Sequence, residues 1–309
     1  MRLAPRVKEV VWGGRWLAEA LGRPGAAEAR LGESWEAYSG SVVEDGPFAG
    51  RTLGDLFQEF GAEMFGSAAV NRPRFPLLAK FIDARQNLSI QVHPDDRLAM
   101  ELEDYPYGKT EFWYVLEAAA GARIVYGLGG TADTEAVRMA LAGGDSGVWR
   151  RVPVRAGDVV FIPAGTVHAL TEGVVVYELQ QDCDITYRLF DWGRVGREIH
   201  VEKGLRCIDF GAGLLEITRP VMRRQAGFSS GELAACDYFR ATLYEVAESL
   251  VAPSRPDSFT LLTCIEGECT LDSGGTLKRG DTLFVPANLP VEVRRSGTTP
   301  ARLIAGALS

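Results

Sequence analysis

Two stretches of the chain share one pattern, and this shared pattern decides the fold. The first is VPVRAGDVVFIPAGTVHAL (residues 152–170), and the second is GTLKRGDTLFVPANLPVEV (residues 275–293). In each stretch a Gly-Asp pair opens an apolar run, and a Pro-Ala pair begins six residues after the glycine. Apolar runs bounded by Gly and Pro turns are typical of β-strands. The sequence therefore contains two copies of a β-unit, too few for a solenoid.

Strand patterns dominate the chain from residue 75 onward. They occur in FPLLAKFIDA, LSIQVH, EFWYVLEA, ARIVYGL, VVVYELQQ and TYRLFDW, separated by Gly, Pro and Asp. A Gly-Asp turn, a strand and a Pro turn into another strand are typical of the double-stranded jelly-roll, or cupin, barrel. We therefore predict a mainly β fold of two cupin-like jelly-roll barrels with a few short helices. An N-terminal segment and the first barrel are expected over residues 1–205, and a second, degenerate barrel without metal ligands over residues 206–309.

Three segments have helical rather than strand patterns. Residues 51–66 place apolar side chains at helical spacing, with Thr52 as the expected N-cap. DDRLAMELED begins with Asp95 and Asp96, either of which can cap a helix. A third helix near residues 197–210 is expected to bridge the two β-rich parts.

Composition limits the classes of partner and the compartment. A net charge of −8 over 309 residues, without a basic run, argues against nucleic acid as the main partner. The five cysteines are scattered and form no Cys-x-x-Cys pair, which is typical of reduced thiols in a cytosolic protein. The uncharged run Val159–Thr171, 13 residues long, is too short to span a bilayer. We expect a cytoplasmic protein without a membrane partner, either a monomer or a weak homo-oligomer.

The scarcity of histidine makes the possible metal ligands few. Of the three histidines, His93 and His168 lie on expected strands, and Glu111 begins another strand whose same-face neighbours are apolar. In the second copy the positions that correspond to Glu111 and His168 are Thr260 and Val291. A His or Glu that the barrel itself needed would be expected in both copies. This asymmetry favours a metal site in the first copy only.

Gln91 and His93 are two residues apart, so their side chains leave an extended strand on one face. Two imidazoles, one carboxylate and one amide oxygen would suit Zn²⁺ or another first-row divalent ion. Inward His and Glu side chains can also satisfy each other by hydrogen bonds. Gln91 can orient a water or a ligand histidine instead of binding a metal. His200 is expected to be an ordinary residue at a helix start.

Four segments resemble the type I phosphomannose isomerases, in particular their short bacterial form. They are FPLLAKFIDARQNLSIQVHPDD, GKTEFWYVL, GDVVFIPAGTVHAL and YELQQDCDITYRLFDWGR, which occur in that order. The resemblance covers about residues 5 to 210, and the family also has a second, degenerate cupin. It implies a reversible, zinc-dependent interconversion of mannose 6-phosphate and fructose 6-phosphate.

The resemblance also implies roles for individual positions. The implied ligands of one zinc ion per chain are Gln91, His93, Glu111 and His168. Arg188 matches the catalytic arginine of the family, and the candidate acid/base is Glu178 or a metal-bound water. The positions implied to lie near the substrate or its phosphate are Ser89, Lys109 and Lys80.

Most of these positions also have a purely structural explanation. Arg188 can pair with Asp191 or Asp184, and Lys109 can be a surface residue beside a glycine turn. Core hydrogen bonds are the alternative for Ser89, Lys80 and Glu178. Arg194 and Arg197 can be solvated surface residues or contacts to the substrate phosphate. Trp12 and Trp35 are expected to be packing residues.

Two rival functions are compatible with the same residues. One is a metal-dependent cupin isomerase of another sugar phosphate, which would differ in the configuration it accepts at C2. The other is a non-catalytic sensor that binds a sugar phosphate or a metal. The presence of Arg188 together with all four candidate ligands weighs against the sensor.

Overall fold

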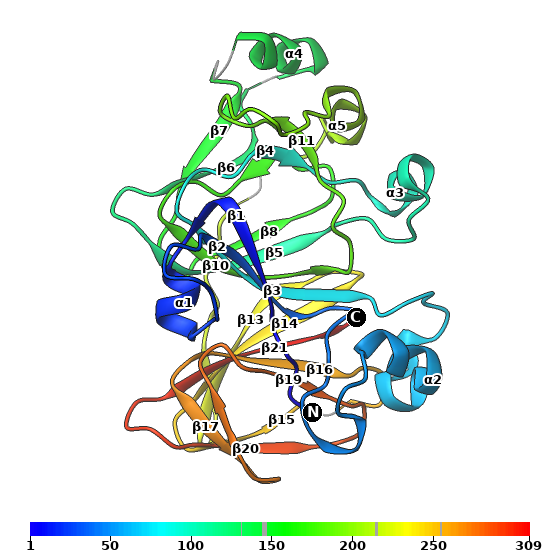
Figure 1. Cartoon of the computed structure of the whole chain (residues 1–309), viewed down its shortest axis with the longest axis vertical. Coiled ribbons are helices and arrows are strands. Elements are labelled where there is room, and N and C mark those ends of the chain that lie inside the picture. The colour runs from blue at the N-terminus through cyan, green and yellow to red at the C-terminus, as the bar shows by residue number, and fades with distance from the viewer. Residues whose placement is uncertain (131, 144–146, 214–215, 254) are drawn as a thin grey trace.

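The computed structural model describes residues 1–309 except 131, 144–146, 214–215 and 254. Its strands form two β-units, one in the upper and one in the lower half of Figure 1. The mainly β fold is thus confirmed. No sheet among the described residues closes into a barrel, so the closed barrels are not confirmed, and each unit consists of two open sheets.

The first unit pairs a six-stranded with a five-stranded sheet. The order of the six-stranded sheet is β1 (Arg6–Gly14), β2 (Leu31–Ala37), β3 (Leu77–Ala84), β10 (Val174–Gln181), β5 (Glu111–Ala118) and β8 (Val159–Ile162). The order of the other is β11 (Tyr187–Phe190), β4 (Ile90–Val92), β9 (His168–Ala169), β6 (Arg123–Leu128) and β7 (Trp149–Pro153). Trp113 and Ile82 from the first sheet pack with Ile124 from the second in one buried cluster, which joins the two sheets.

The second unit repeats this arrangement with a six-stranded and a four-stranded sheet. The six-stranded sheet has the order β12 (Arg223–Arg224), β13 (Phe228–Ala235), β14 (Phe239–Val246), β21 (Ala301–Leu308), β16 (Thr260–Glu266) and β19 (Thr282–Val285). The four-stranded sheet has the order β15 (Ser249–Ala252), β20 (Val291–Arg295), β17 (Glu268–Leu271) and β18 (Thr276–Lys278).

Strand register confirms the duplication inferred from the sequence. Glu111 on β5 pairs with Ile162 on β8, and Thr260 on β16 pairs with Val285 on β19. Both partners are the residue just before the proline of the repeated Pro-Ala pair. The alignment of Glu111 with Thr260 is therefore a structural equivalence.

The two units pack through the outer faces of their six-stranded sheets. The rings of Phe112 on β5 and Phe239 on β14 lie 6.0 Å apart, and both are fully buried. The Tyr177 hydroxyl of β10 lies 3.5 Å from the Thr263 hydroxyl of β16. Because alternate residues of a strand face opposite ways, the other faces of β5 and β10 remain available to build a site inside the first unit.

Two of the predicted helices form with the predicted caps. Thr52 accepts a hydrogen bond from the Asp55 N–H in a capping box that begins α2 (Leu53–Phe65). Asp95 caps α3 (Asp96–Glu103) by accepting from the Leu98 N–H. The third, α5 (Val201–Cys207), is shorter than predicted. The predictions missed α1 (Trp16–Leu21) and α4 (Thr134–Gly143).

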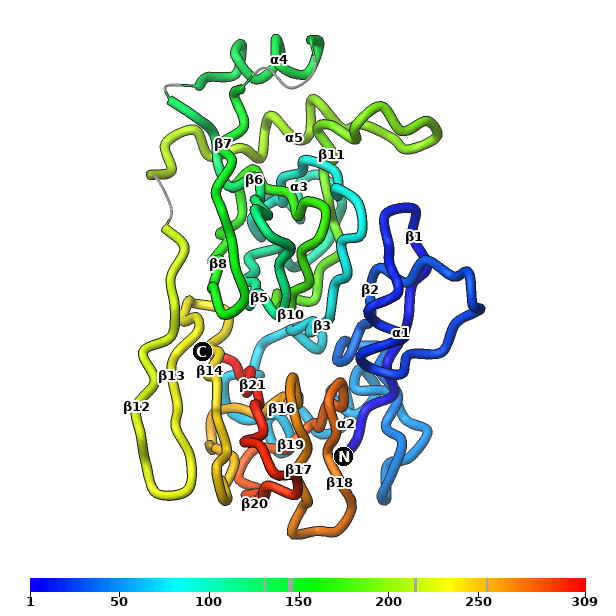
Figure 2. The backbone as a smooth tube through the Cα atoms, turned by 90° about the vertical axis from the view of Figure 1, so that its left-hand side faces the viewer, coloured from blue at the N-terminus to red at the C-terminus, as the bar shows by residue number. Residues whose placement is uncertain are grey.

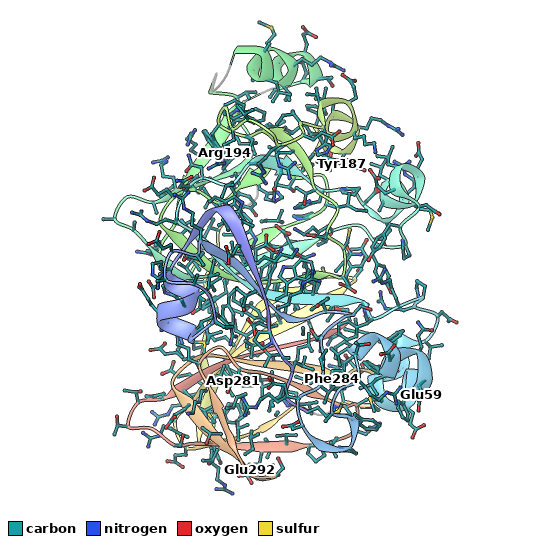
Figure 3. The ribbon with its side chains drawn as sticks, in the orientation of Figure 1. Glu59, Tyr187, Arg194, Asp281, Phe284 and Glu292 are labelled. Atoms are coloured by element: carbon teal, nitrogen blue, oxygen red, sulfur yellow. The ribbon has the colours of Figure 1, made fainter. Side chains whose placement is uncertain are left out.

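The N-terminal residues lie on the second unit, not the first. The Leu3 N–H donates to the Thr282 carbonyl, and Figure 2 shows the end marked N beside the strands of the second unit. Phe65 of α2 packs against Phe284 of β19, with ring centroids 4.9 Å apart. Figure 3 shows Phe284 and Asp281 in this lower unit and Tyr187 and Arg194 in the upper one. The division after residue 205 falls inside α5 and stays a prediction. Within the described ranges, each helix is too short or too polar to cross a membrane.

Candidate active site

His93, Glu111 and His168 meet inside the first unit. Glu111 begins β5, His168 begins β9, and His93 directly follows β4. Glu111 Oε2 lies 3.7 Å from His93 Nε2, and Glu111 Oε1 lies 3.4 Å from His168 Nε2. The candidate ligand atoms all lie within 4.8 Å of one another, and the three side chains are almost completely buried. The structure thus brings together three of the four predicted ligands.

Both imidazoles are oriented by backbone carbonyls. His93 Nδ1 lies 3.0 Å from the Ile185 oxygen, and His168 Nδ1 lies 2.9 Å from the Thr166 oxygen. If Nδ1 carries the proton in each ring, the Nε2 lone pair faces Glu111. Burial lowers the pKa of both rings, that of His168 to about 4, which keeps both imidazoles neutral near pH 7.

The donor set at this cluster suits a divalent cation. Neither Glu111 oxygen has a hydrogen bond of good geometry within the described residues. A buried carboxylate is costly unless a positive charge or donor is nearby. The Lys109 ammonium lies 2.7 Å from Oε2, whereas Oε1 faces the neutral His168 imidazole at 3.4 Å. Two neutral imidazole nitrogens and one carboxylate are the ligands that Zn²⁺ and similar ions take in proteins. The residues present therefore fit a metal site.

Gln91 lies beside this cluster on β4. It pairs with His168 across β4 and β9, and its Nε2 lies 3.2 Å from His168 Nε2. The Ser89 hydroxyl donates to Gln91 Oε1. In this arrangement the amide nitrogen, not the oxygen, faces the cluster. A half-turn of the amide about its last bond would present the oxygen there.

Two buried lysines pair with two buried carboxylates next to the cluster. Lys80 Nζ lies 2.9 Å from Glu178 Oε1, and Lys109 Nζ lies 2.7 Å from Glu111 Oε2 and 3.2 Å from His93 Nε2. Burial alone would lower the pKa of both lysines, but the surrounding carboxylates together, chiefly Glu178 for Lys80 and Glu111 for Lys109, raise it. Both lysines therefore stay charged. The surface location considered for Lys109 is wrong, because only 3% of the residue is exposed.

Arg188 is held by a loop rather than by a carboxylate. Its Nη1 donates to the Glu198 carbonyl, its N–H donates to His200 Nδ1, and its carbonyl accepts from the His200 N–H. The Asp191 carboxylate is bound instead by Arg194 and Arg197. The pairing of Arg188 with Asp191 considered from the sequence is thus not formed. Burial and the neighbouring Arg197 lower the pKa of Arg188, which nevertheless remains a cation near pH 7.

The predicted residues line a cavity of about 270 Å³. The lining side chains that the sequence had singled out as site residues are Ser89, Gln91, Lys80, Lys109, Glu178 and Arg188. Gln91 and Lys109 also contact the His–Glu cluster, which places the cluster at the cavity wall. All nine predicted site residues are therefore close together.

Several lining residues were missed. Lys8 and Glu33 reach the cavity from β1 and β2, and Trp12 lines it as well as packing in the core. Trp113 was expected only to continue an apolar row, yet its indole N–H donates to Glu178 Oε2 at 2.7 Å. No pattern along the chain identifies this contact, because it depends on which strands are neighbours.

Comparisons with known proteins give consistent matches. Residues 1–111 match the family described as phosphomannose isomerase type I, catalytic domain, and residues 230–297 match mannose-6-phosphate isomerase, cupin domain. The chain is 35% identical over 299 residues to mannose-6-phosphate isomerase ManA of Bacillus subtilis (strain 168), covering 92% of each protein. It is 31% identical over 296 residues to the mannose-6-phosphate isomerase of Streptococcus mutans, covering 92% of this chain and 91% of that protein. The crystal structure of the mannose 6-phosphate isomerase from Bacillus subtilis superposes with a TM-score of 0.89 at 32% identity, covering 99% of this chain and 98% of that chain.

Proposed function

The chain belongs to the type I phosphomannose isomerase family, and from this we propose how its own residues interconvert mannose 6-phosphate and fructose 6-phosphate. The observation that carries the proposal is a single cavity that joins the His–Glu cluster, two Lys–Glu pairs and Arg188. An aldose–ketose isomerase needs such a combination, because it must bind two neighbouring oxygens, stabilise negative charge and move a proton between two carbons.

We assign the metal site to His93, Glu111 and His168, with Gln91 as a fourth candidate, and propose one zinc ion per chain. When bound, the ion supplies Lewis-acid stabilisation of negative charge on the substrate oxygens. The support for this assignment is the pair of oriented imidazoles, the Glu111 carboxylate without a well-aligned hydrogen bond, and their mutual proximity.

Glu178 is the proposed acid/base group. In the direction from mannose 6-phosphate, the C2–H bond breaks, a C1–H bond forms, and a proton passes from the C2 hydroxyl to the C1 oxygen. Of the carboxylates that line the cavity, Glu33, Glu178 and Asp184, the fully buried one is Glu178, with the Lys80 ammonium at one oxygen and the Trp113 indole N–H at the other. Such a fixed carboxylate can take the proton from C2 and return it at C1.

The cationic side chains would bind and orient the substrate. Because Lys109 Nζ lies 2.7 Å from Glu111 of the proposed metal site, we assign Lys109 to the reacting oxygens rather than to the remote phosphate. Arg188 cannot easily act as a base, so we assign it to hold substrate oxygens and stabilise developing charge. Ser89 and Lys80 complete the proposed substrate contacts. Binding energy from these groups would align C1 and C2 with Glu178.

The second unit is proposed to support the first without taking part in the chemistry. The positions equivalent to Glu111 and His168 are Thr260 and Val291. The outer face of its six-stranded sheet packs against the sheet that carries Glu111 and Glu178. We further propose that the enzyme is cytoplasmic. We also propose that it is a monomer or a weak homo-oligomer, and light scattering of the purified protein would test this oligomeric state.

The decisive experiment measures turnover and metal content together. Protein treated with a chelator should lose the interconversion of the two sugar phosphates and regain it with Zn²⁺. His168→Ala should lose both bound metal and activity, whereas Val291→Ala, the matched change in the second unit, should keep both. Absence of turnover with any divalent metal, while a sugar phosphate still binds, would favour the non-catalytic sensor.

A further inference from the structure

Three residues of the site form one row across neighbouring strands of the six-stranded sheet. Glu178 on β10 pairs directly with Lys80 on β3 and with Trp113 on β5. Lys80 Nζ lies 2.9 Å from Glu178 Oε1, and the Trp113 indole N–H donates to Glu178 Oε2 at 2.7 Å. At most 3% of each of these three residues is exposed. Each oxygen of the Glu178 carboxylate is thus held from a different side.

Trp113 also contacts the proposed metal site. Its ring meets the His168 ring edge to face, with centroids 5.5 Å apart and an interplanar angle of 75°. Glu111 lies two residues earlier on the same strand, so both side chains leave β5 on the same face. Trp113 therefore lies between the carboxylate proposed to move the proton and the cluster proposed to hold the metal.

The second unit shows what this row contains when no site is present. The corresponding row is Thr242 on β14, Ala305 on β21 and Leu262 on β16, which are paired in the same way. A leucine fills the place of Trp113 in an intact sheet, so the fold does not require tryptophan there. The indole, the carboxylate and the ammonium are all absent from the unit that also lacks the His–Glu cluster.

We propose that Trp113 is a positioning residue that fixes the plane of the Glu178 carboxylate through its indole N–H. The proposal rests on the role given to Glu178 above. Without this donor, one oxygen of a buried carboxylate has no partner and the group can turn about its last bond. A misaligned base transfers the C2 proton more slowly, although the substrate still binds.

The first test is the substitution Trp113→Phe, which keeps an aromatic ring and removes the N–H. We expect kcat to fall about 10- to 100-fold, the usual effect of losing a hydrogen bond to a charged group, with KM and metal content nearly unchanged. The matched control is Trp149→Phe. Trp149 is similarly buried, and its indole nitrogen has no hydrogen bond within the described part of the chain. It should keep the wild-type kcat.

Dependence on Glu178 is tested with Glu178→Gln and the double variant. If Trp113 acts through Glu178, Trp113→Phe should slow the Glu178→Gln enzyme by less than twofold. The inference would be overturned if Trp113→Phe lowered kcat by the same factor in the wild-type and Glu178→Gln enzymes, or if it left the kcat of the wild-type enzyme unchanged. An inactive wild-type enzyme would instead contradict the proposed function itself.

A spectroscopic test does not depend on whether Trp113→Phe folds. The indole N–H resonance of Trp113 in the ¹⁵N-labelled wild type should lie downfield of that of Trp149, because a carboxylate accepts its proton. Glu178→Gln should move the Trp113 resonance upfield and leave the Trp149 resonance in place. A Trp113 resonance that does not respond to Glu178→Gln would show that the bond is not formed and would refute the proposal.

Discussion

The buried pair of Arg23 and Glu36 should make the stability of the protein depend on pH. Arg23 Nη2 lies 2.8 Å from Glu36 Oε2, and the Ser34 hydroxyl donates to the other carboxylate oxygen. The same guanidinium donates to the Gly280 carbonyl of the second unit, so the pair lies where the units meet. Burial raises the pKa of Glu36 from 4.5 to about 7, although Arg23 and Ser34 act in the opposite direction.

The sign of the effect follows from this raised pKa. Between pH 4.5 and about 7 the folded protein binds more protons at Glu36 than the unfolded chain does, so its stability falls as the pH rises. At ~1.4 kcal/mol per pKa unit, the loss between pH 5 and pH 8 is roughly 2–3 kcal/mol. Above pH 8 this group should cause no further change.

The measurement is urea unfolding of the wild type and Glu36→Gln at several pH values. Because Gln does not titrate, the wild-type free energy of unfolding should fall by roughly 2–3 kcal/mol relative to the variant between pH 5 and pH 8. Glu59→Gln, at an exposed carboxylate on α2, is the control and should follow the wild-type curve. Parallel curves for the wild type and Glu36→Gln would refute the reasoning.

Three further predictions concern single contacts. His200→Ala should lower kcat/KM about tenfold without loss of metal, because the Arg188 N–H loses its hydrogen bond to His200 Nδ1, whereas His200→Asn should retain part of the activity through its side-chain acceptor. An equal fall in kcat/KM in both variants, measured by steady-state kinetics, would show that this hydrogen bond does not position Arg188. Phe239→Ala should cost about 3–5 kcal/mol of unfolding free energy in denaturant melts, since it opens a cavity between the units, and a cost below ~1 kcal/mol would contradict their tight packing. Thr52→Ala should cost ~1 kcal/mol by loss of the α2 cap, and Thr52→Ser should restore most of it in the same melts.

The fold was predictable wherever the relevant information is local. The repeated Gly-Asp and Pro-Ala turns indicated two related β-units, and Thr52 and Asp95 marked the starts of α2 and α3. Whether a sheet closes depends on how its outer strands meet in space, which the repeat does not encode. The helix α1 has only six residues, and α4 buries only Val137 and Ala140, so neither gives a strong periodic pattern.

The site was predictable because the second β-unit of the same chain shows which residues the fold has when no site is present. Thr260 and Val291 showed that Glu111 and His168 are not needed for the sheet, and the structure brings the latter two together. The burial of Lys109 could not be predicted, because a lysine is buried only when nearby carboxylates compensate its charge, and the sequence does not show that Glu111 and Glu178 meet around it. The bond between Trp113 and Glu178 joins residues 65 positions apart and requires knowledge of the strand order.

The docking of the N-terminal residues on the second unit constrains the order in which the protein can fold during synthesis. Leu3 hydrogen-bonds to Thr282, so its partner leaves the ribosome only after nearly the whole chain has been made. Until then Leu3 lacks Thr282 and Phe65 of α2 lacks Phe284, although Leu3 can already pair with Val43 and Phe65 can already pack on Phe75. Contacts that close such long loops form late and slowly. We therefore expect nascent chains that stop before Phe259 to leave Phe65 without Phe259 and Phe284, hence more accessible, and to need protection from aggregation while translation finishes.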